Sequence, residues 1–190
     1  EPAYLAEGEE SVEAVCSLAA AAFLDFRERS GVEKAVFLRT IADEVDVLEE
    51  EIVSRMTTET GLPEGRCRME KGRTCGQLRL FASLLEEGSW VDARIDHADP
   101  DRAPVAKPDC RSMWRPIGPV VVFCASNFPL AYSVAGGDTA SALASGCPVI
   151  VKAHGSHPGT AEIVATAVRI AVEKCGMHEG VFSMLYGSGR

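Results

Sequence analysis

The sequence predicts an α/β protein, with amino-terminal helices followed by part of a parallel, doubly wound sheet. After Arg115, two short apolar runs, Val120–Phe123 and Pro148–Val151, are separated by a helix-length segment rich in Ala, Ser and Leu. Runs that are apolar on both faces are typical of strands buried in a parallel sheet. Before Arg115, apolar residues recur at the three- and four-residue spacing of helices instead.

The first half of the chain predicts three helices and an extended connection. Helical periodicity covers residues 9–30, 32–58 and 64–87, with Ser11 capping the first helix and Gly31 ending it. The acidic run Glu49–Glu51 predicts a solvated helix face. Residues 89–113 contain three prolines and alternate weakly, which predicts an extended excursion or an edge hairpin.

The second half predicts a β-α-β-α-β unit. Its elements are a strand at 117–123, a helix with Pro129 near its first turn, a strand at 148–152, a helix at 159–174 opened by Pro158, and a strand at 181–186. Handedness rules leave few topologies for such a unit, and the doubly wound dinucleotide-binding arrangement leads them. The chain thus divides into a helical segment at 1–88, an excursion at 89–114 and a sheet region at 115–190.

Composition narrows the function classes. A net charge of −9 argues against a nucleic-acid surface, which needs clustered Lys and Arg. No apolar run approaches the roughly 20 residues of a membrane span, and the acidic start EPAYLAEGEE is unlike a signal peptide. Seven cysteines without a CxxC pair fit reduced thiols. We therefore expect a soluble cytoplasmic protein that binds neither membrane nor nucleic acid.

Asn127 and Lys152 are the first candidates for a functional site, because each follows an apolar strand. Ligands of open parallel sheets collect outside the carboxyl ends of the strands. Asn127 could cap the helix expected near Pro129 or could donate its amide N–H to a developing oxyanion. Lys152 could be a strand-end lysine that extends to solvent or a charge that contacts a cofactor ribose or phosphate. Position alone does not choose between these readings.

Other motifs argue against simple alternatives. His154 and His157 lack a Cys or carboxylate partner, so we expect no metal site. The run Gly136-Gly137-Asp138-Thr139 lies in an expected helix, where glycine favours close packing over phosphate binding. Neither GxGxxG after the first strand nor GxxxxGK[ST] occurs in the chain. A dinucleotide would have to be held without the usual glycine fingerprint.

The run PIGPVVVFCASNFPLAYSVAGGDTASALASGCPVIVKAHGSHPGTAEIVA resembles the aldehyde dehydrogenase superfamily, especially its NADP-dependent bacterial members that oxidise ketoglutarate semialdehyde. The upstream run AAAAFLDFRERSGVEKAVFLRTIADEV is similar to the amino-terminal helices of that family. The resemblance implies an aldehyde dehydrogenase fold, here incomplete, with a Rossmann-like NAD(P)-binding part at 115–190. It also implies that residues 89–114 extend toward oligomerisation strands, so we expect a homo-oligomer, a dimer or a tetramer.

The resemblance assigns roles to residues by position. Asn127 corresponds to the oxyanion-hole asparagine, and Lys152 to the lysine that contacts the adenosine ribose. Phe123 and Ala125 would line the cofactor channel. Further cofactor contacts are expected at His154, Gly155, Gly189 and Arg190.

Gly155 and Arg190 imply a preference for NADP, with NAD still possible. NAD-dependent relatives usually carry a Glu at the position of Gly155, where it binds the ribose hydroxyls. Its absence removes a repulsion against a 2′-phosphate, and Arg190 falls where NADP-dependent relatives place a phosphate-binding Arg.

The resemblance also implies what these residues lack. The family's nucleophilic Cys and general-base Glu lie downstream of Arg190, so we expect this chain alone to be inactive. Cys75 and Cys124 are expected to be structural. The leading interpretation is the amino-terminal part of an NADP-dependent aldehyde dehydrogenase. The alternatives are a non-catalytic cofactor-binding or structural fragment, and a dehydrogenase of another semialdehyde or of a fatty aldehyde.

Overall fold

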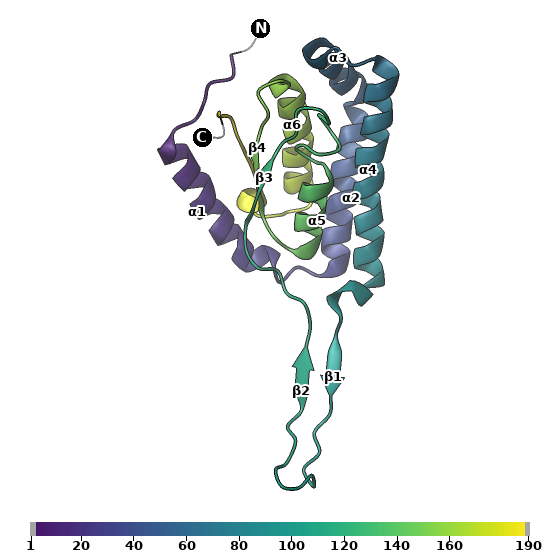
Figure 1. Cartoon of the computed structure of the whole chain (residues 1–190), viewed down its shortest axis with the longest axis vertical. Coiled ribbons are helices and arrows are strands. Elements are labelled where there is room, and N and C mark those ends of the chain that lie inside the picture. The colour runs from purple at the N-terminus through teal and green to yellow at the C-terminus, as the bar shows by residue number, and fades with distance from the viewer. Residues whose placement is uncertain (1–2, 189–190) are drawn as a thin grey trace.

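Three parallel strands form the central sheet of the computed structural model, which describes residues 3–188 (Figure 1). They are β3 (Val120–Phe123), β4 (Val149–Lys152) and β5 (Phe182–Leu185), hydrogen-bonded in the order β3-β4-β5. Val149, Ile150 and Val151 of the central strand are buried, as expected for a strand covered on both faces. The parallel sheet confirms the predicted α/β class.

Helices cover both faces of this sheet (Figure 1). The two crossover helices, α5 (Gly137–Ser145) and α6 (Pro158–Lys174), lie on one face. This is the expected arrangement, because right-handed crossovers between parallel strands that advance in one direction place their helices on the same face. Helix α1 (Glu9–Phe26) packs across the other face, against β4, β5 and the short 3-10 helix η2 (Glu179–Val181).

A second helical layer packs outside α5 and α6. It consists of α2 (Gly31–Val47), α3 (Glu49–Thr60) and α4 (Glu64–Glu87). The core between the layers is apolar and contains, among the largest fully buried side chains, Phe26, Phe37, Leu38, Ile41, Ile52, Met56, Leu78, Leu130 and Leu143. Burial of these side chains holds the helical half of the chain against the sheet.

A hairpin extends away from the body after α4 and the 3-10 helix η1 (Ser89–Val91) (Figure 1). Its strands, β1 (Arg94–Asp96) and β2 (Cys110–Ser112), pair antiparallel. All six strand residues are exposed, which explains their weak apolar alternation. The predicted extended excursion is confirmed as a hairpin.

The expected helix boundaries at Ser11 and Gly31 are wrong. Helix α1 begins at Glu9 after Gly8 and ends at Phe26. Gly31 begins α2, because Ser30 and Glu33 form a capping box in which Glu33 N donates to Ser30 Oγ (3.2 Å) and Ser30 N donates to Glu33 Oε2 (2.8 Å). A side chain at position 31 would meet Leu85 O at 2.6 Å, so close packing against α4 requires glycine there.

The expected helix at 32–58 is divided into α2 and α3 at Leu48, where the backbone leaves the helical conformation (φ −94°, ψ 13°). The acidic run Glu49–Glu51 therefore begins α3 instead of lying in mid-helix. Glu49 and Glu50 both accept hydrogen bonds from Arg68 of α4, so part of this run is ion-paired with a neighbouring helix.

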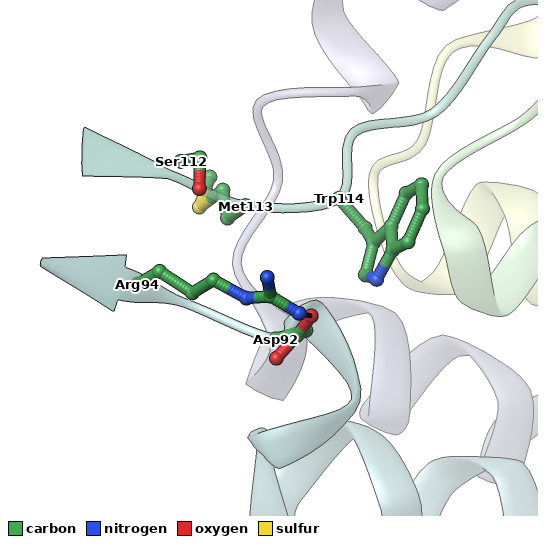
Figure 2. A pocket seen from close by; sticks show the side chains of 5 residues that line it. All are labelled: Asp92, Arg94, Ser112, Met113 and Trp114. Carbon is green, nitrogen blue, oxygen red and sulfur yellow. Dashed lines mark hydrogen bonds and ion pairs between the residues drawn. The ribbon is translucent and has the colours of Figure 1, made fainter. Parts of the chain in front are cut away.

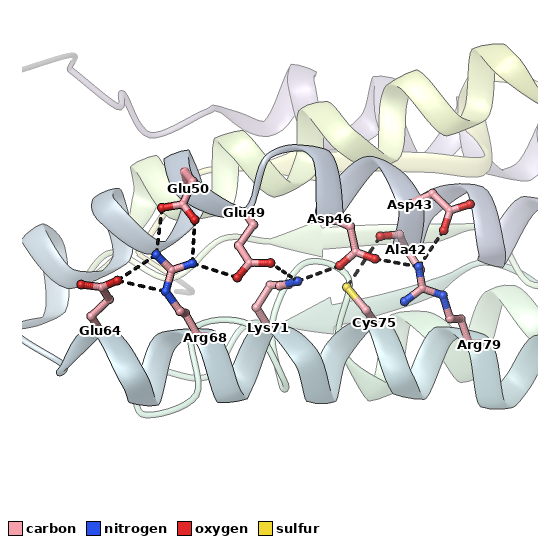
Figure 3. Close-up of polar contacts among 10 residues, drawn as sticks. All are labelled: Ala42, Asp43, Asp46, Glu49, Glu50, Glu64, Arg68, Lys71, Cys75 and Arg79. Carbon is pink, nitrogen blue, oxygen red and sulfur yellow. Dashed lines mark hydrogen bonds and ion pairs between the residues drawn. The ribbon is translucent and has the colours of Figure 1, made fainter.

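An ion-pair cluster joins α2 and α3 to α4 (Figure 3). Lys71, only 8% exposed, donates to Asp46 Oδ1 (2.7 Å) and also pairs with Glu49. Burial opposes ionisation of Asp46, but hydrogen bonds from Lys71 and Arg79 hold the pKa of its carboxyl below the usual value. Hydrogen bonds from Lys71 and Arg68 likewise lower the pKa of Glu49. These carboxylates stabilise the fold in their ionised form.

We expect Lys71→Met to lower the free energy of unfolding at pH 7 by about 1–3 kcal/mol, because it removes charge-assisted hydrogen bonds from a nearly buried site. A carboxylate whose pKa is lower in the folded protein makes its full contribution to stability above its unfolded pKa, which is about 4. This contribution is lost as the pH falls through the pKa of the folded state. The loss caused by Lys71→Met should therefore shrink below about pH 4.

Urea unfolding followed by circular dichroism at pH 7, 5 and 3 measures this loss. Lys174→Met is the matched control, because Lys174 forms an ion pair with Glu44 (2.6 Å) but its side chain is 58% exposed. An exposed pair contributes about 1 kcal/mol or less. Equal losses for the two variants, or a Lys71→Met loss that grows in acid, would contradict the role given to the cluster.

All seven cysteines are free, and four of them, Cys67, Cys75, Cys124 and Cys147, are buried. The four buried cysteines pack as small core residues, as the sequence predicts. No helix within residues 3–188 combines the length and apolarity needed to cross a membrane.

Candidate functional site

The carboxyl ends of β3 and β4 bring most of the predicted site residues together. Phe123 and Lys152 are register partners at this edge, and Cys124 N donates to Lys152 O (3.1 Å). Lys152 is half-buried at the end of its strand, whereas Phe123 is 65% exposed on the uncovered face of β3. The expectation that β3 is buried on both faces is wrong, because Val121 and Phe123 are exposed on one face while Val122 is buried on the other.

Asn127 lies in a bend after β3, and its side chain is exposed. The helix expected near Pro129 does not form there: α5 begins only at Gly137, with Gly136 as its N-cap. Residues 129–136 instead make turns, in which Ala125 N donates to Tyr132 O (2.9 Å) and Ser133 Oγ donates to Phe128 O (3.2 Å). The reading of Asn127 as a helix cap is therefore wrong, and its amide is not used in capping.

The expectation that Gly136 lies inside a helix is corrected by the same turns. A side chain at Gly136 would meet Ala131 O at 2.5 Å and Ser133 N at 2.8 Å. Only glycine lets these backbone segments approach so closely. Gly136 thus supports the shape of the segment 125–136, which we call the Asn127 loop.

His157 supports the start of the Asn127 loop. Its ring is fully buried, and Nε2 lies 2.8 Å from Ala125 O. Because a carbonyl oxygen only accepts, Nε2 carries the hydrogen of this contact. Nδ1 is buried and has no hydrogen-bond partner among the described residues. This histidine therefore connects the segment after β4 to the segment after β3.

His154 stacks on His157, with 5.4 Å between ring centroids, and its Nδ1 accepts from Ser156 N (3.1 Å). Burial and the proximity of His157 and Lys152 lower the pKa of His154 below its usual value, so the ring is neutral at pH 7. With Nδ1 used as an acceptor, Nε2 of His154 carries the hydrogen and can donate to a ligand. Within residues 3–188 no group of three or more His, Cys, Asp or Glu side chains could hold a metal ion.

The start of α6, which follows β4, is occupied by a carboxylate from α3. Glu59 accepts from Gly159 N (2.8 Å), Thr160 N (2.8 Å) and Thr160 Oγ1 (2.8 Å). Burial opposes its ionisation, yet these hydrogen bonds hold the pKa of Glu59 below its usual value. Helix N-termini often bind phosphate, but here the amides are already used by an anion. The N-terminus of α6 is therefore not a free anion site.

Gly155 provides open space beside Lys152. It is exposed, and no atom lies within 4 Å of the position that a Cβ would take. An ammonium group, a neutral histidine donor and unoccupied space at the carboxyl edge of a parallel sheet fit the ribose of a nicotinamide cofactor. The remaining two predicted contacts, Gly189 and Arg190, lie outside the described residues.

Cys75 and Cys124, the two cysteines weighed from the sequence, are unreactive thiols. Burial raises the pKa of Cys124 to about 11 and the pKa of Cys75 to about 12. At neutral pH both are protonated, whereas the nucleophilic form of cysteine is the thiolate. This agrees with the expectation that both are structural.

Two hollows elsewhere are weaker candidates. A cavity of about 250 Å³ at the base of the hairpin is lined by five residues, Asp92, Arg94, Ser112, Met113 and Trp114 (Figure 2). Its one cation, Arg94, is paired with Asp92 (2.7 Å), and the lining holds no group able to act as an activated nucleophile. A groove of about 440 Å³ runs beside β3 and includes Phe123 and Asp138. This groove therefore lies beside β3, which carries Phe123, a residue predicted to line the cofactor channel.

Glu70 and Glu59 support the site but were not predicted from the sequence. Both are acceptors for backbone N–H groups of segments about 60 and 100 residues away. The sequence holds one signal for Glu70: it falls among the buried positions of α4 together with Cys67, Thr74 and Leu78. A carboxylate within a buried helix face requires a partner, and that requirement marks the position.

Comparison with known proteins identifies the family. The model of the aldehyde dehydrogenase family matches residues 3–190. The chain is 52% identical over 189 residues to alpha-ketoglutaric semialdehyde dehydrogenase 2 of Azospirillum brasilense, covering 100% of this chain and 36% of that protein. It is 45% identical over 179 residues to alpha-ketoglutaric semialdehyde dehydrogenase of Acinetobacter baylyi, covering 94% of this chain and 34% of the relative.

A similar fold occurs in a solved structure of glyceraldehyde-3-phosphate dehydrogenase from Methanocaldococcus jannaschii in complex with NADP. The TM-score is 0.78 at 20% identity, over 97% of this chain and 38% of the other. The present chain spans about a third of the length of the curated relatives above. On the match of the family model to nearly all of its residues, the chain belongs to the aldehyde dehydrogenase family.

Proposed function

We propose that this chain supplies the amino-terminal, cofactor-side part of an NADP-dependent aldehyde dehydrogenase that oxidises ketoglutarate semialdehyde to the carboxylic acid. The observation that carries the proposal is the placement of Asn127 and Lys152 at one sheet edge, with the Asn127 amide exposed and not used as a helix cap. The choice of substrate is supported by the identity of 52% to a relative named for that semialdehyde.

In this proposal each residue at the edge has one task. The Asn127 amide donates to the oxyanion that forms when a thiolate from the rest of the protein attacks the aldehyde. Lys152 donates to the adenosine ribose, and Phe123 and Ala125 line the channel beside it. His154 offers Nε2–H to the same part of the cofactor. When bound, NADP accepts the hydride from the substrate carbon.

The preference for NADP rests on charge. Gly155 leaves room beside Lys152 for a 2′-phosphate, and it brings no carboxylate that would repel one. Arg190 is proposed to bind that phosphate through its guanidinium group. A cytoplasmic location and a homo-oligomer, a dimer or a tetramer, complete the proposal.

Steady-state kinetics of the full-length protein that contains this chain test the proposed function. We expect the highest kcat/KM with ketoglutarate semialdehyde and NADP, followed by glutamate semialdehyde, and a low value with a fatty aldehyde. A higher kcat/KM with another aldehyde would make that aldehyde the assigned substrate and leave the assignment to the family unchanged. Folded protein that binds NADP but oxidises none of the three aldehydes would support a non-catalytic role instead.

A further inference from the structure

One face of α4 contacts the Asn127 loop at three successive positions. The Arg66 guanidinium lies over the ring of Phe128, 4.9 Å from its centroid. Glu70 Oε1 accepts from Leu130 N (2.9 Å) and from Ala131 N (3.0 Å). Arg73 Nη2 donates to the hydroxyl of Tyr132 (2.7 Å). Residues four and three apart lie on one helix face, so the three side chains hold one continuous stretch of loop, 128–132.

Glu70 is the centre of this contact. It is 2% exposed, and a buried carboxylate is costly unless it is hydrogen-bonded and paired. Its two backbone donors come from the loop, and Arg66 Nη2 lies 3.4 Å from its second oxygen. The loop needs these acceptors as well, because residues 129–136 form turns without the hydrogen-bond ladder of a helix.

Asn127 lies between two fixed points of the backbone. On its amino-terminal side, Ala125 O is held by His157 Nε2 (2.8 Å), and Ala125 N donates to Tyr132 O (2.9 Å). On its carboxyl-terminal side, the amides of Leu130 and Ala131 are held by Glu70. The exposed Asn127 side chain thus depends on these anchors for its direction, since it lies in neither a helix nor a strand.

We propose that Glu70 is a positioning residue for the oxyanion donor: its buried carboxylate fixes the Asn127 loop so that the Asn127 amide points at the reacting carbonyl oxygen. The proposal rests on the proposed function, because it assigns Glu70 a task only if Asn127 binds the oxyanion. A donor displaced by about 1 Å can lower a rate about a hundredfold. The effect of Glu70 should therefore pass through Asn127.

A double-mutant cycle in the full-length protein tests this. We expect Glu70→Ala to lower kcat/KM per titrated active site by about 10- to 100-fold while the Kd of NADP stays within about twofold. Glu70→Gln should recover most of the loss, because its amide oxygen can accept both backbone N–H groups. In the Asn127→Ala background, Glu70→Ala should change kcat/KM by less than about twofold.

Lys71→Met is the matched control, because Lys71 is the next residue of α4 and contacts α2 and α3. It should destabilise the protein without changing kcat/KM per active site. If Glu70→Ala does not fold, Glu70→Asp replaces it in the cycle, since a shortened carboxylate must draw the loop toward α4. Equal effects of the Glu70 variant in the two backgrounds, or no effect in either, would overturn the positioning role. An Asn127→Ala protein with unchanged kcat/KM would overturn the proposed function itself.

Discussion

Asn127→Ala in the full-length protein is expected to lower kcat/KM for aldehyde oxidation by about 100- to 1,000-fold. The amide N–H group is proposed to donate to an oxygen whose charge develops only in the transition state, so its loss removes stabilisation that the ground state does not share. The side chain is exposed, so its truncation leaves no buried polar group behind. The Kd of NADP and the melting temperature should change little.

Ser126→Ala is the control for Asn127→Ala, because Ser126 is exposed in the same bend and has no proposed contact with substrate or cofactor. Its kcat/KM should stay within about twofold of wild type. Steady-state rates with the semialdehyde and fluorescence titration with NADP measure the two quantities. A comparable loss in both variants would show that the bend matters and that the amide does not.

Gly155→Glu is expected to weaken NADP binding by about tenfold or more, while NAD binding is kept or strengthened. A carboxylate a few ångströms from a 2′-phosphate costs about 1.4–2 kcal/mol after screening, which is about 10- to 30-fold in Kd. With NAD the same carboxylate can accept hydrogen bonds from the ribose hydroxyls. A side chain can start at this position without a clash, because no atom lies within 4 Å of its Cβ.

Gly155→Gln separates charge from size, since it fills the same space without the carboxylate. We expect it to retain a preference for NADP, whereas Arg190→Ala should weaken NADP binding and leave NAD binding nearly unchanged. Titration of the three variants with both cofactors measures the six affinities. If Gly155→Glu and Gly155→Gln weaken NADP equally, bulk and not charge governs the choice of cofactor.

The sequence predicts the sheet well because its signals there are local. Each apolar run is short, ends in polar residues and is followed by helical periodicity, and Pro158 opens α6 where a first-turn proline is favoured. The sequence also predicts the excursion at 89–113, because a segment with three prolines and many polar residues does not form a buried helix or strand. These elements can be predicted from neighbouring residues in the sequence, without knowing which segments pack against them.

The errors occur where contacts between distant segments decide the local structure. Pro129 suggests a helix start, but Glu70 binds the amides of Leu130 and Ala131 and stabilises turns until Gly137. The apolar spacing through Leu48 continues without interruption although the backbone breaks there. The apolar run predicts that Val121 and Phe123 are buried, yet both are exposed on the uncovered face of β3. For the turns after Pro129, the partner that decides the local structure lies about 60 residues away in the sequence.

The sequence alone proposes candidate residues for the site but not the contacts that support them. A polar residue after each apolar run makes Asn127 and Lys152 candidates without any structure. The buried ring of His157 and the carboxylates of Glu59 and Glu70 gain their meaning only from the backbone groups that they bind. Such side-chain-to-backbone contacts leave no motif, because the backbone partner can have any side chain.

The most direct test of the account is the pre-steady-state rate of NADPH formation in Asn127→Ala. This rate follows the steps up to hydride transfer and is independent of later product release. If Asn127 stabilises the oxyanion, the rate falls about 100- to 1,000-fold at saturating semialdehyde and NADP, and Ser126→Ala matches wild type. An unchanged rate in Asn127→Ala would contradict the assignment of this sheet edge as the place where the aldehyde reacts.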